Sequence, residues 1–446
     1  MRRLAPSTKC DKIIFNYFTG SQWPNGKEPA MEKHDTGVTE TTSTENDGRE
    51  TASDKITQTI GIDLGDKEHH FHILDGEGET IQSGTFPGTW KALKNMFAQR
   101  EKTTVAFEAG THSPWISRDL EAWGHRVLVG NPRKLRAIYQ DPGKCDERDA
   151  EMLARLARFE PSLLCPIQHR GEKCQADLAV LKGRDALVRA RASLINHCRG
   201  AVKSFGARLP TCSAPSFERQ AREELPEPLR PALDPVLDTI GELTNKIKEV
   251  DKTINVLGEE YAETAVLREI NGVGALTSLA FVLTLESPAR FEKSRSVPAH
   301  LGLLPRRDQS GDLDKQLPIT KAGNKFLRRL LVSCAHYVLG PFGKDCDLRR
   351  WGLKLCACGG KNAKKRATVA VARKLSVIMH RLWSDSGPYD AFLQAKARGE
   401  FDAQAQVELE KEAEKKKTEK AKKGKKVTKK KTTKIKEGPK SIKNAA

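Results

Sequence analysis

The pattern of hydrophobic and polar residues changes twice along the chain, and the first block has the periodicity of a mixed sheet. Apolar and polar side chains alternate there, or short apolar runs are separated by glycine, asparagine and aspartate. The predicted strands are 59–64, 69–74, 80–86, 103–108 and 126–129, and the predicted helices are 114–123 and 146–159. Three consecutive strands, followed by strands that alternate with helices, is the order of an α/β RNase H-like (RuvC-like) fold.

The second block has a helical period. Apolar residues recur at helical spacing from 174 to 205, and a second helical run follows a proline-rich break at 210–235. That second run consists of Leu237, Ile240, Leu243, Ile247, Val250, Ile254, Leu257 and Tyr261. Alternating three- and four-residue steps of this kind form an a/d seam and predict a helical hairpin or coiled coil. The seam serves either internal packing or an interface between protomers, and the pattern leaves both open.

The third block, 264–395, is predicted to be mainly α-helical. It opens with Ile270-Asn271-Gly272-Val273-Gly274 before an apolar helix at 275–285. A Gly-x-Gly turn that enters a helix presents backbone N–H groups to a phosphate, as helix-hairpin-helix elements do. Gly272 and Gly274 are therefore candidate nucleic-acid contacts, although a helix can also begin with glycines for purely structural reasons.

Charge separates the folded part of the chain from its end. The 446 residues carry a formal net charge of +19. From Lys411 to Ala446 there are sixteen lysines and four glutamates, a net of +12, so +7 remains for the other 410 residues. A polycationic tail attracts phosphate backbones without reading sequence, or it serves only to keep the chain in solution. The segments 1–54 and 396–446 are predicted to be disordered, and 55–165, 166–263 and 264–395 to be an α/β domain, a helical linker and a helical domain.

No part of the sequence predicts a membrane span or an export signal. No stretch approaches eighteen uncharged apolar residues, and no apolar segment follows the two N-terminal arginines. We therefore expect a cytoplasmic protein.

Four acidic residues stand where an RNase H-like fold would place catalytic carboxylates. Asp63 lies inside an apolar strand, where an unpaired charge is costly, and Glu108 ends the fourth predicted strand. Asp146 and Asp149 are three residues apart at the start of a helix and so share one face. Together these carboxylates can hold two Mg²⁺ ions for phosphoryl transfer. Taken singly, Glu108 can be a turn residue, and Asp149 can simply favour the helix dipole.

A basic segment surrounds one serine. Ser310 and Gly311 lie within about 25 residues of six cations, which are Arg306, Arg307, Lys321, Lys325, Arg328 and Arg329. A serine hydroxyl can attack a phosphodiester once cations have neutralised the phosphate. The alternative is that Ser310-Gly311 is a turn and the cations only grip DNA.

The carboxylate and serine segments together resemble a known family, the DEDD transposases of IS110-type insertion sequences. The resemblance rests on Gly61-Ile62-Asp63-Leu64, on Phe107-Glu108-Ala109-Gly110 and on the segment 144–150. Downstream it rests on Ile270–Gly274, Gly302-Leu303-Leu304-Pro305, Ser310-Gly311, the Ile319–Asn324 segment and Leu327-Arg328-Arg329. Both blocks in this order are specific, and the matches span 56–379.

The resemblance implies a mechanism. Asp63, Glu108, Asp146 and Asp149 would bind Mg²⁺ in a RuvC-like domain, and Ser310, in a C-terminal transposase domain, would link covalently to a DNA strand. Family members form a composite site, often across protomers, and are guided by an RNA from the element that pairs with donor and target DNA. A homodimer or homotetramer associated with the bacterial nucleoid is expected. The expected nucleic-acid contacts are Gly272, Gly274, Arg306, Arg307, Lys321, Asn324, Arg328 and Arg329.

The sequence departs from the family pattern at a few positions. Asn271 replaces a usual proline, Gln309 a frequent small residue, and Cys145 a common threonine. None of these removes an expected catalytic group. Two rival functions remain at this stage: a RuvC-like Holliday-junction nuclease that uses water as nucleophile, and a non-catalytic DNA- or RNA-binding domesticated transposase.

Overall fold

The computed structural model describes residues 58–138, 145–311 and 313–402. These residues form two compact units, one ending at Ala176 and the other beginning at Asp177. The predicted extension 1–54 and most of the predicted tail lie outside the described residues. No helix among the described residues is both long and apolar enough to cross a bilayer.

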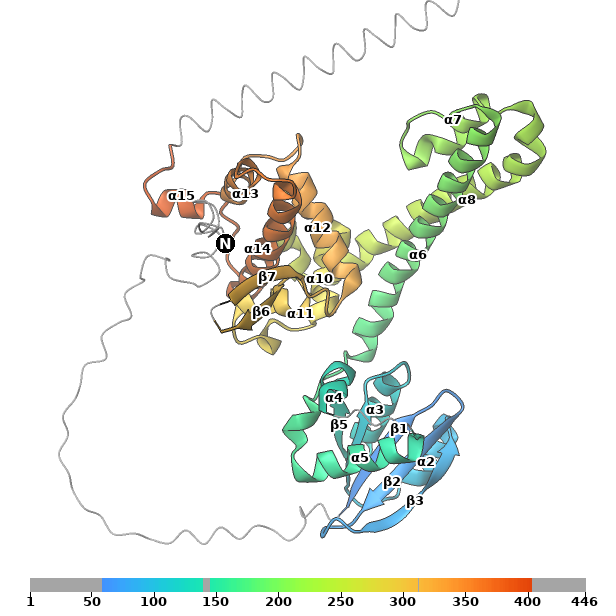
Figure 1. The fold of residues 1–446 in the computed structure, drawn as a ribbon, viewed down its shortest axis with the longest axis vertical. Coiled ribbons are helices and arrows are strands. Elements are labelled where there is room, and N and C mark those ends of the chain that lie inside the picture. Colours follow the sequence, from blue (N-terminus) through green and yellow to red (C-terminus); the bar gives the residue numbers. More distant parts are fainter. Residues whose placement is uncertain (1–57, 139–144, 312, 403–446) are drawn as a thin grey trace, which may run out of the picture. The chain divides into compact units, whose positions relative to one another are not determined.

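The first unit is built on a five-stranded sheet (Figure 1). The strands are β1 (Thr59–Leu64), β2 (Glu68–Leu74), β3 (Thr80–Pro87), β4 (Thr104–Glu108) and β5 (Arg126–Gly130). Their order is β3-β2-β1-β4-β5. The first three are antiparallel, while β1, β4 and β5 are parallel. All five predicted strands are confirmed, and this mixed α/β arrangement is compatible with the predicted RNase H-like fold.

Helices cover both faces of the sheet. The helices of this unit are α2 (Trp90–Phe97), α3 (Ser113–Ala122), α4 (Pro132–Ile138) and α5 (Asp146–Phe159). One face packs a core of Ile60, Ile62 and Phe107 against Leu93 of α2 and Ile116 of α3. The other face carries a smaller core, which contains Ala106 and Leu128 of the sheet and Leu135, Leu153, Ala157 and Leu164. The predicted helices α3 and α5 are confirmed, and α2 and α4 were not anticipated.

Helix α5 lies directly against β1, and Gly61 makes that approach possible. A Cβ at Gly61 would collide with the backbone oxygen of Ala150 and would lie 2.5 Å from the backbone nitrogen of Ala154. Backbone atoms cannot move aside as a flexible side chain can, so any larger residue would push the helix outward. Figure 1 shows α5 (teal) lying across the strands.

Two helices of 30 residues each follow, α6 (Glu172–Ala201) and α8 (Arg230–Glu259), and the second unit includes α6 from Asp177 onward. They run antiparallel, because Arg191 donates to Thr244 at 3.1 Å, Arg184 pairs with Asp251 about two turns further along, and Tyr261 donates to Asp177 at 2.5 Å. A short helix, α7 (Phe217–Glu223), closes a core at their far ends.

The predicted seam on α8 is only partly enclosed. Leu237, Ile240, Ile247 and Ile254 are buried. Leu243, Val250 and Leu257 keep intermediate exposure. Thr244 is buried where the predicted seam has Leu243. The buried face of α8 is therefore rotated away from Leu243, Val250 and Leu257.

The rest of the second unit is mainly helical, as predicted. Its helices are α9 (Glu263–Arg268), α10 (Ala275–Leu285), α11 (Val297–His300), α12 (Lys325–Leu339), α13 (Asp347–Ala357), α14 (Ala363–Asp385) and α15 (Leu393–Ala397). Helix α10 is buried from Thr277 to Leu285. A hairpin of β6 (Pro305–Ser310) and β7 (Leu313–Ile319) extends the chain between α11 and α12.

The base of this hairpin is held by two glycines and one arginine. Gly302 and Gly323 both have left-handed backbones, and a Cβ on either would collide with backbone of the opposite turn, at Ala322 and His300. The Arg328 Nη1 donates to the carbonyl oxygens of Leu301 at 2.7 Å and Ala322 at 3.1 Å. Arg328 therefore joins the two segments that enter and leave the hairpin.

We predict that Gly61→Ala destabilises the first unit by about 2–3 kcal/mol, because the new methyl group meets helix backbone. Thermal unfolding followed by circular dichroism measures this change. Gly110→Ala is the matched control, since nothing lies within 4 Å of a Cβ there. A substitution at Gly110 is expected to change stability by less than about 0.5 kcal/mol. Equal transitions for the two variants would show that α5 does not depend on this contact.

We also predict that Arg328→Met lowers the free energy of unfolding by about 2 kcal/mol, because two carbonyl groups lose a charged donor. Protease cleavage between 305 and 319 should become faster in the same variant. Lys325→Met is the control, since Lys325 is an exposed cation on the same helix. If both variants behaved alike, Arg328 would have no special role in holding the hairpin.

Candidate functional site

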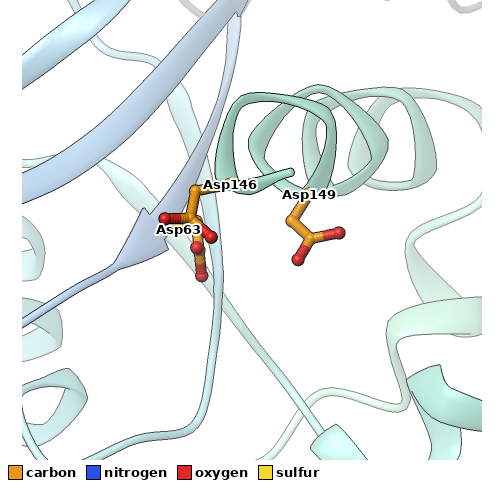
Figure 2. Close-up of side chains that lie close together, drawn as sticks. All are labelled: Asp63, Asp146 and Asp149. Atoms are coloured by element: carbon orange, nitrogen blue, oxygen red, sulfur yellow. The ribbon is translucent and has the colours of Figure 1, made fainter. Parts of the chain in front are cut away.

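Three of the four predicted carboxylates meet in the first unit. Asp63 lies near the end of β1, and Asp146 and Asp149 lie in the first turn of α5. One carboxylate oxygen from each of the three lies within 4.8 Å of the others. Figure 2 shows the three side chains gathered between the strand end and the first turn of the helix. Among the described residues, this is the only group of three or more acidic, histidine or cysteine side chains close enough to hold one metal ion.

The geometry follows from the contact at Gly61. Ala150, whose backbone lies over Gly61, follows directly after Asp149. Asp63 is two residues beyond Gly61 on β1 and so points to the same face of the sheet. The tight contact thus fixes the height of the helix above the strand, and with it the separation of the carboxylates.

Glu108 ends the neighbouring parallel strand. Ile62 pairs with Phe107 between β1 and β4, so the next residues, Asp63 and Glu108, lie level and on the same face. The side chain of Glu108 is exposed, and it is not one of the three that share the 4.8 Å separation. The structure thus brings three of the predicted ligands together and leaves the fourth on the adjacent strand.

The electrostatics of the cluster favour a cation. Asp63 and Asp149 are half-buried and Asp146 is exposed. Three negative charges at this separation repel one another, and the positive end of α5, with Asp146, Glu147 and Asp149 in its first turn, offsets only part of that repulsion. A set of carboxylate oxygens open to solvent can bind a hard divalent cation. Metal binding by such a cluster also neutralises charge that would otherwise oppose a phosphate's approach.

A cleft of about 580 Å³ adjoins this cluster. It is lined by His70, Ser83, Gly84, Thr85, Cys145, Asp146 and Glu147. His70 is the cross-strand partner of Asp63, so strand register could have singled it out from its neighbours. His69 and His72, on the same strand, are buried instead.

Ser310 lies at the tip of the β6–β7 hairpin. It is exposed, it is the last residue of β6, and Gly311 follows it with a φ of 53°. Arg307 pairs with Asp314 through two contacts of 2.8 and 2.7 Å. Because side chains alternate along a strand, this ion pair belongs to the opposite face from Ser310. The register of the hairpin shifts between Pro305 and Arg307, at Arg306.

The other predicted nucleic-acid contacts differ from one another in their structural roles. Arg328 donates to backbone carbonyl groups, and Arg329 pairs with Asp185. Asn324 caps α12 by accepting from the Leu327 N–H at 3.0 Å, and Lys321 is an exposed turn residue with φ of 54°. Of the predicted cations, Arg307, Arg328 and Arg329 therefore contact protein.

The two turn glycines also differ. Gly272 has a φ of 92°, and a Cβ there would lie 3.1 Å from Tyr337 and 3.2 Å from Val338, so its place is explained by packing against α12. Gly274 precedes α10 and is exposed, with nothing within 4 Å of a Cβ. Only Gly274 combines exposure with open space at the start of the helix.

Comparisons with known proteins agree with both blocks of this arrangement. A model of DEDD transposases matches residues 60–206, and a model described as "Transposase IS116/IS110/IS902 family" matches 264–344. A transposase for insertion sequence element IS1328 from Yersinia enterocolitica is 32% identical over 281 residues, which cover 62% of this chain and 82% of that protein. A transposase for insertion sequence element IS1111A from Coxiella burnetii is 29% identical over 346 residues, 75% of this chain and 92% of that one. The strand end and the helix turn that bring the carboxylates together fall inside the first match. On these two matches and this similarity, the chain belongs to the IS110 family of DNA transposases.

Proposed function

We propose that this transposase cuts and rejoins the DNA strands of an insertion sequence with two groups, a Mg²⁺-binding carboxylate site and the nucleophilic Ser310. The observation that carries the proposal is the approach of Asp63, Asp146 and Asp149 to within 4.8 Å. The donor set consists of oxygen atoms only, which fits Mg²⁺ and not a metal that prefers nitrogen or sulfur. Asp63, Asp146 and Asp149 would hold the ion, with Glu108 beside them on β4.

When bound, the divalent ion supplies charge neutralisation at the scissile phosphate. The residues of the chain orient and confine the reaction. Gly61 sets the height of α5, and the exposed Asp146 opens the site toward the cleft that contains His70 and Ser83. A DNA strand that crosses the cleft would bring its phosphate to the carboxylates.

Ser310 has the exposure that a nucleophile for a polymeric substrate needs. Its hydroxyl would give up its proton and the oxygen would form a bond to phosphorus as the bond from phosphorus to the leaving sugar oxygen breaks, and that sugar oxygen would take up a proton in return. Arg306, earlier on β6, is exposed and would contact the backbone of the same DNA strand. The hairpin base, held by Gly302, Gly323 and Arg328, would keep Ser310 in place.

We further propose that the assembly is a homodimer or homotetramer guided by an element-encoded RNA, with donor and target DNA as substrates. The half-exposed row of Leu243, Val250 and Leu257 on α8 supports a protomer interface of coiled-coil type. The proposed functional division of the chain remains 1–54, 55–165, 166–263, 264–395 and 396–446. The lysine-rich end would add affinity for nucleic acid of any sequence.

A water-using nuclease is the second candidate function. The observation that favours it is that the carboxylate cluster is complete within the first unit, without a residue from the second. Such an enzyme would cleave a junction but would form no covalent link to the strand.

We predict that Mg²⁺ or Mn²⁺ stabilises the protein, by about 1.4 kcal/mol when the free ion is at roughly ten times its Kd. Differential scanning calorimetry with and without the ion measures the effect. Asp63→Asn and Asp149→Asn should abolish the stabilisation. Glu147→Gln is the matched control, because Glu147 lies in the same helix turn but outside the cluster. Loss of the stabilisation in Glu147→Gln as well would point to a diffuse negative field rather than to a site.

We predict that the protein forms a covalent adduct with labelled DNA in the presence of Mg²⁺ and the element-derived RNA, visible on a denaturing gel. Ser310→Ala should reduce the adduct below about one thousandth of the wild-type level, and Asp63→Ala should do the same. Gln309→Ala, on the opposite face of β6, should retain it. Cleavage without an adduct that survives Ser310→Ala but not Asp63→Ala would establish the water-using nuclease and refute the serine mechanism.

A further inference from the structure

The segment from 348 to 384 has an extreme charge composition for a folded part of the chain. Its 37 residues contain ten lysines or arginines and no aspartate or glutamate. It covers most of α13 and α14 and is separate from the lysine-rich end of the chain. Because the segment itself contains no acid, its cations have their partners outside it or face solvent.

Half of these ten cations are occupied within the second unit. Arg349 donates to the carbonyl groups of Val338 and Gly340, and Arg350 pairs with Asp345. Arg381 pairs with Asp385, and the Lys374 Nζ lies 4.8 Å from the Trp351 ring centre. Arg373 is half-buried. The fold accounts for these five.

The other five are exposed, and four of them gather where α13 turns into α14. These four are Lys361, Lys364, Lys365 and Arg366, which we name the basic turn; the fifth is Lys354. Gly359 and Gly360, with φ of 77° and 87°, form the bend that precedes them. Within the described residues, none of the four takes part in an ion pair.

The position of the basic turn is unfavourable for the fold itself. Lys364, Lys365 and Arg366 occupy the first turn of a helix of 23 residues that has no acidic residue in that turn. The helix dipole places a positive potential at this end, so the charges of these three side chains are repelled by it. Residues that oppose local stability without a compensating contact indicate a function. An anion from outside the fold would relieve the repulsion.

We propose that the basic turn binds the phosphate backbone of duplex DNA. Exposed lysines and an arginine on a tight bend, next to the positive end of a helix, match closely spaced phosphates and read no base sequence. DNA is the partner because the chain belongs to a family of DNA transposases. The inference rests on that DNA substrate and not on the serine mechanism, so loss of the Ser310 adduct would leave it standing.

The test compares two charge-matched variants of the full chain. One is Lys361→Gln/Lys364→Gln/Lys365→Gln, and the other is Lys246→Gln/Lys248→Gln/Lys252→Gln, which changes three exposed lysines on α8. Affinity for a DNA duplex of about 30 base pairs, of arbitrary sequence, is measured across a range of salt concentrations. A duplex RNA of the same length is measured in parallel, and the melting temperature of each variant is recorded.

For the basic-turn variant, the slope of log K against log salt should fall by about 2 to 3, and affinity near 0.1 M salt should fall on the order of 100-fold. Its melting temperature should be unchanged or higher, since the repulsion at the helix end is relieved. The α8 variant should lose much less affinity. Equal losses in the two variants, an unchanged slope, or a loss confined to RNA would each overturn the proposal.

Discussion

The contact between α5 and β1 at Gly61 is the constraint on which the carboxylate site depends. Without a side chain at this position, helix backbone rests on strand backbone, and Ala150 and Ala154 line the contact with small side chains. The acids of the first helix turn then reach Asp63 without a long side chain. The repulsion among them is the energetic consequence, and a cation offsets it.

The second unit uses its positive charge in two different ways. Arg328 and Arg349 donate to backbone carbonyl groups near chain turns, so these arginines are part of the architecture. Exposed lysines at the start of α14 have no such role in the described fold. Arginine, with its five donors, suits the first task, while an exposed lysine can meet a phosphate as a flexible point charge.

Sequence patterns predicted the sheet of the first unit well because every strand except β3 buries several of its residues. The buried rows of β1, β2 and β4 produce the apolar runs and alternation on which the prediction relied. Strand β6 has no such row, since Arg306 to Ser310 are all exposed, and the β6–β7 hairpin was not anticipated. Helix α2 was also missed, because it buries only Leu93 and Phe97 within eight residues.

The sequence by itself determined the order of strands and helices, the acids that end those elements, and the resemblance to a family. Local periodicity and residue type depend only on neighbours along the chain, so they can be seen without coordinates. Tertiary structure alone decided that Asp63, Asp146 and Asp149 meet while Glu108 stands apart on β4. It also decided that Arg328 and Arg329 bind protein while the lysines before and within α14 face solvent. These outcomes depend on which distant backbones approach one another, and that is set by packing rather than by local pattern.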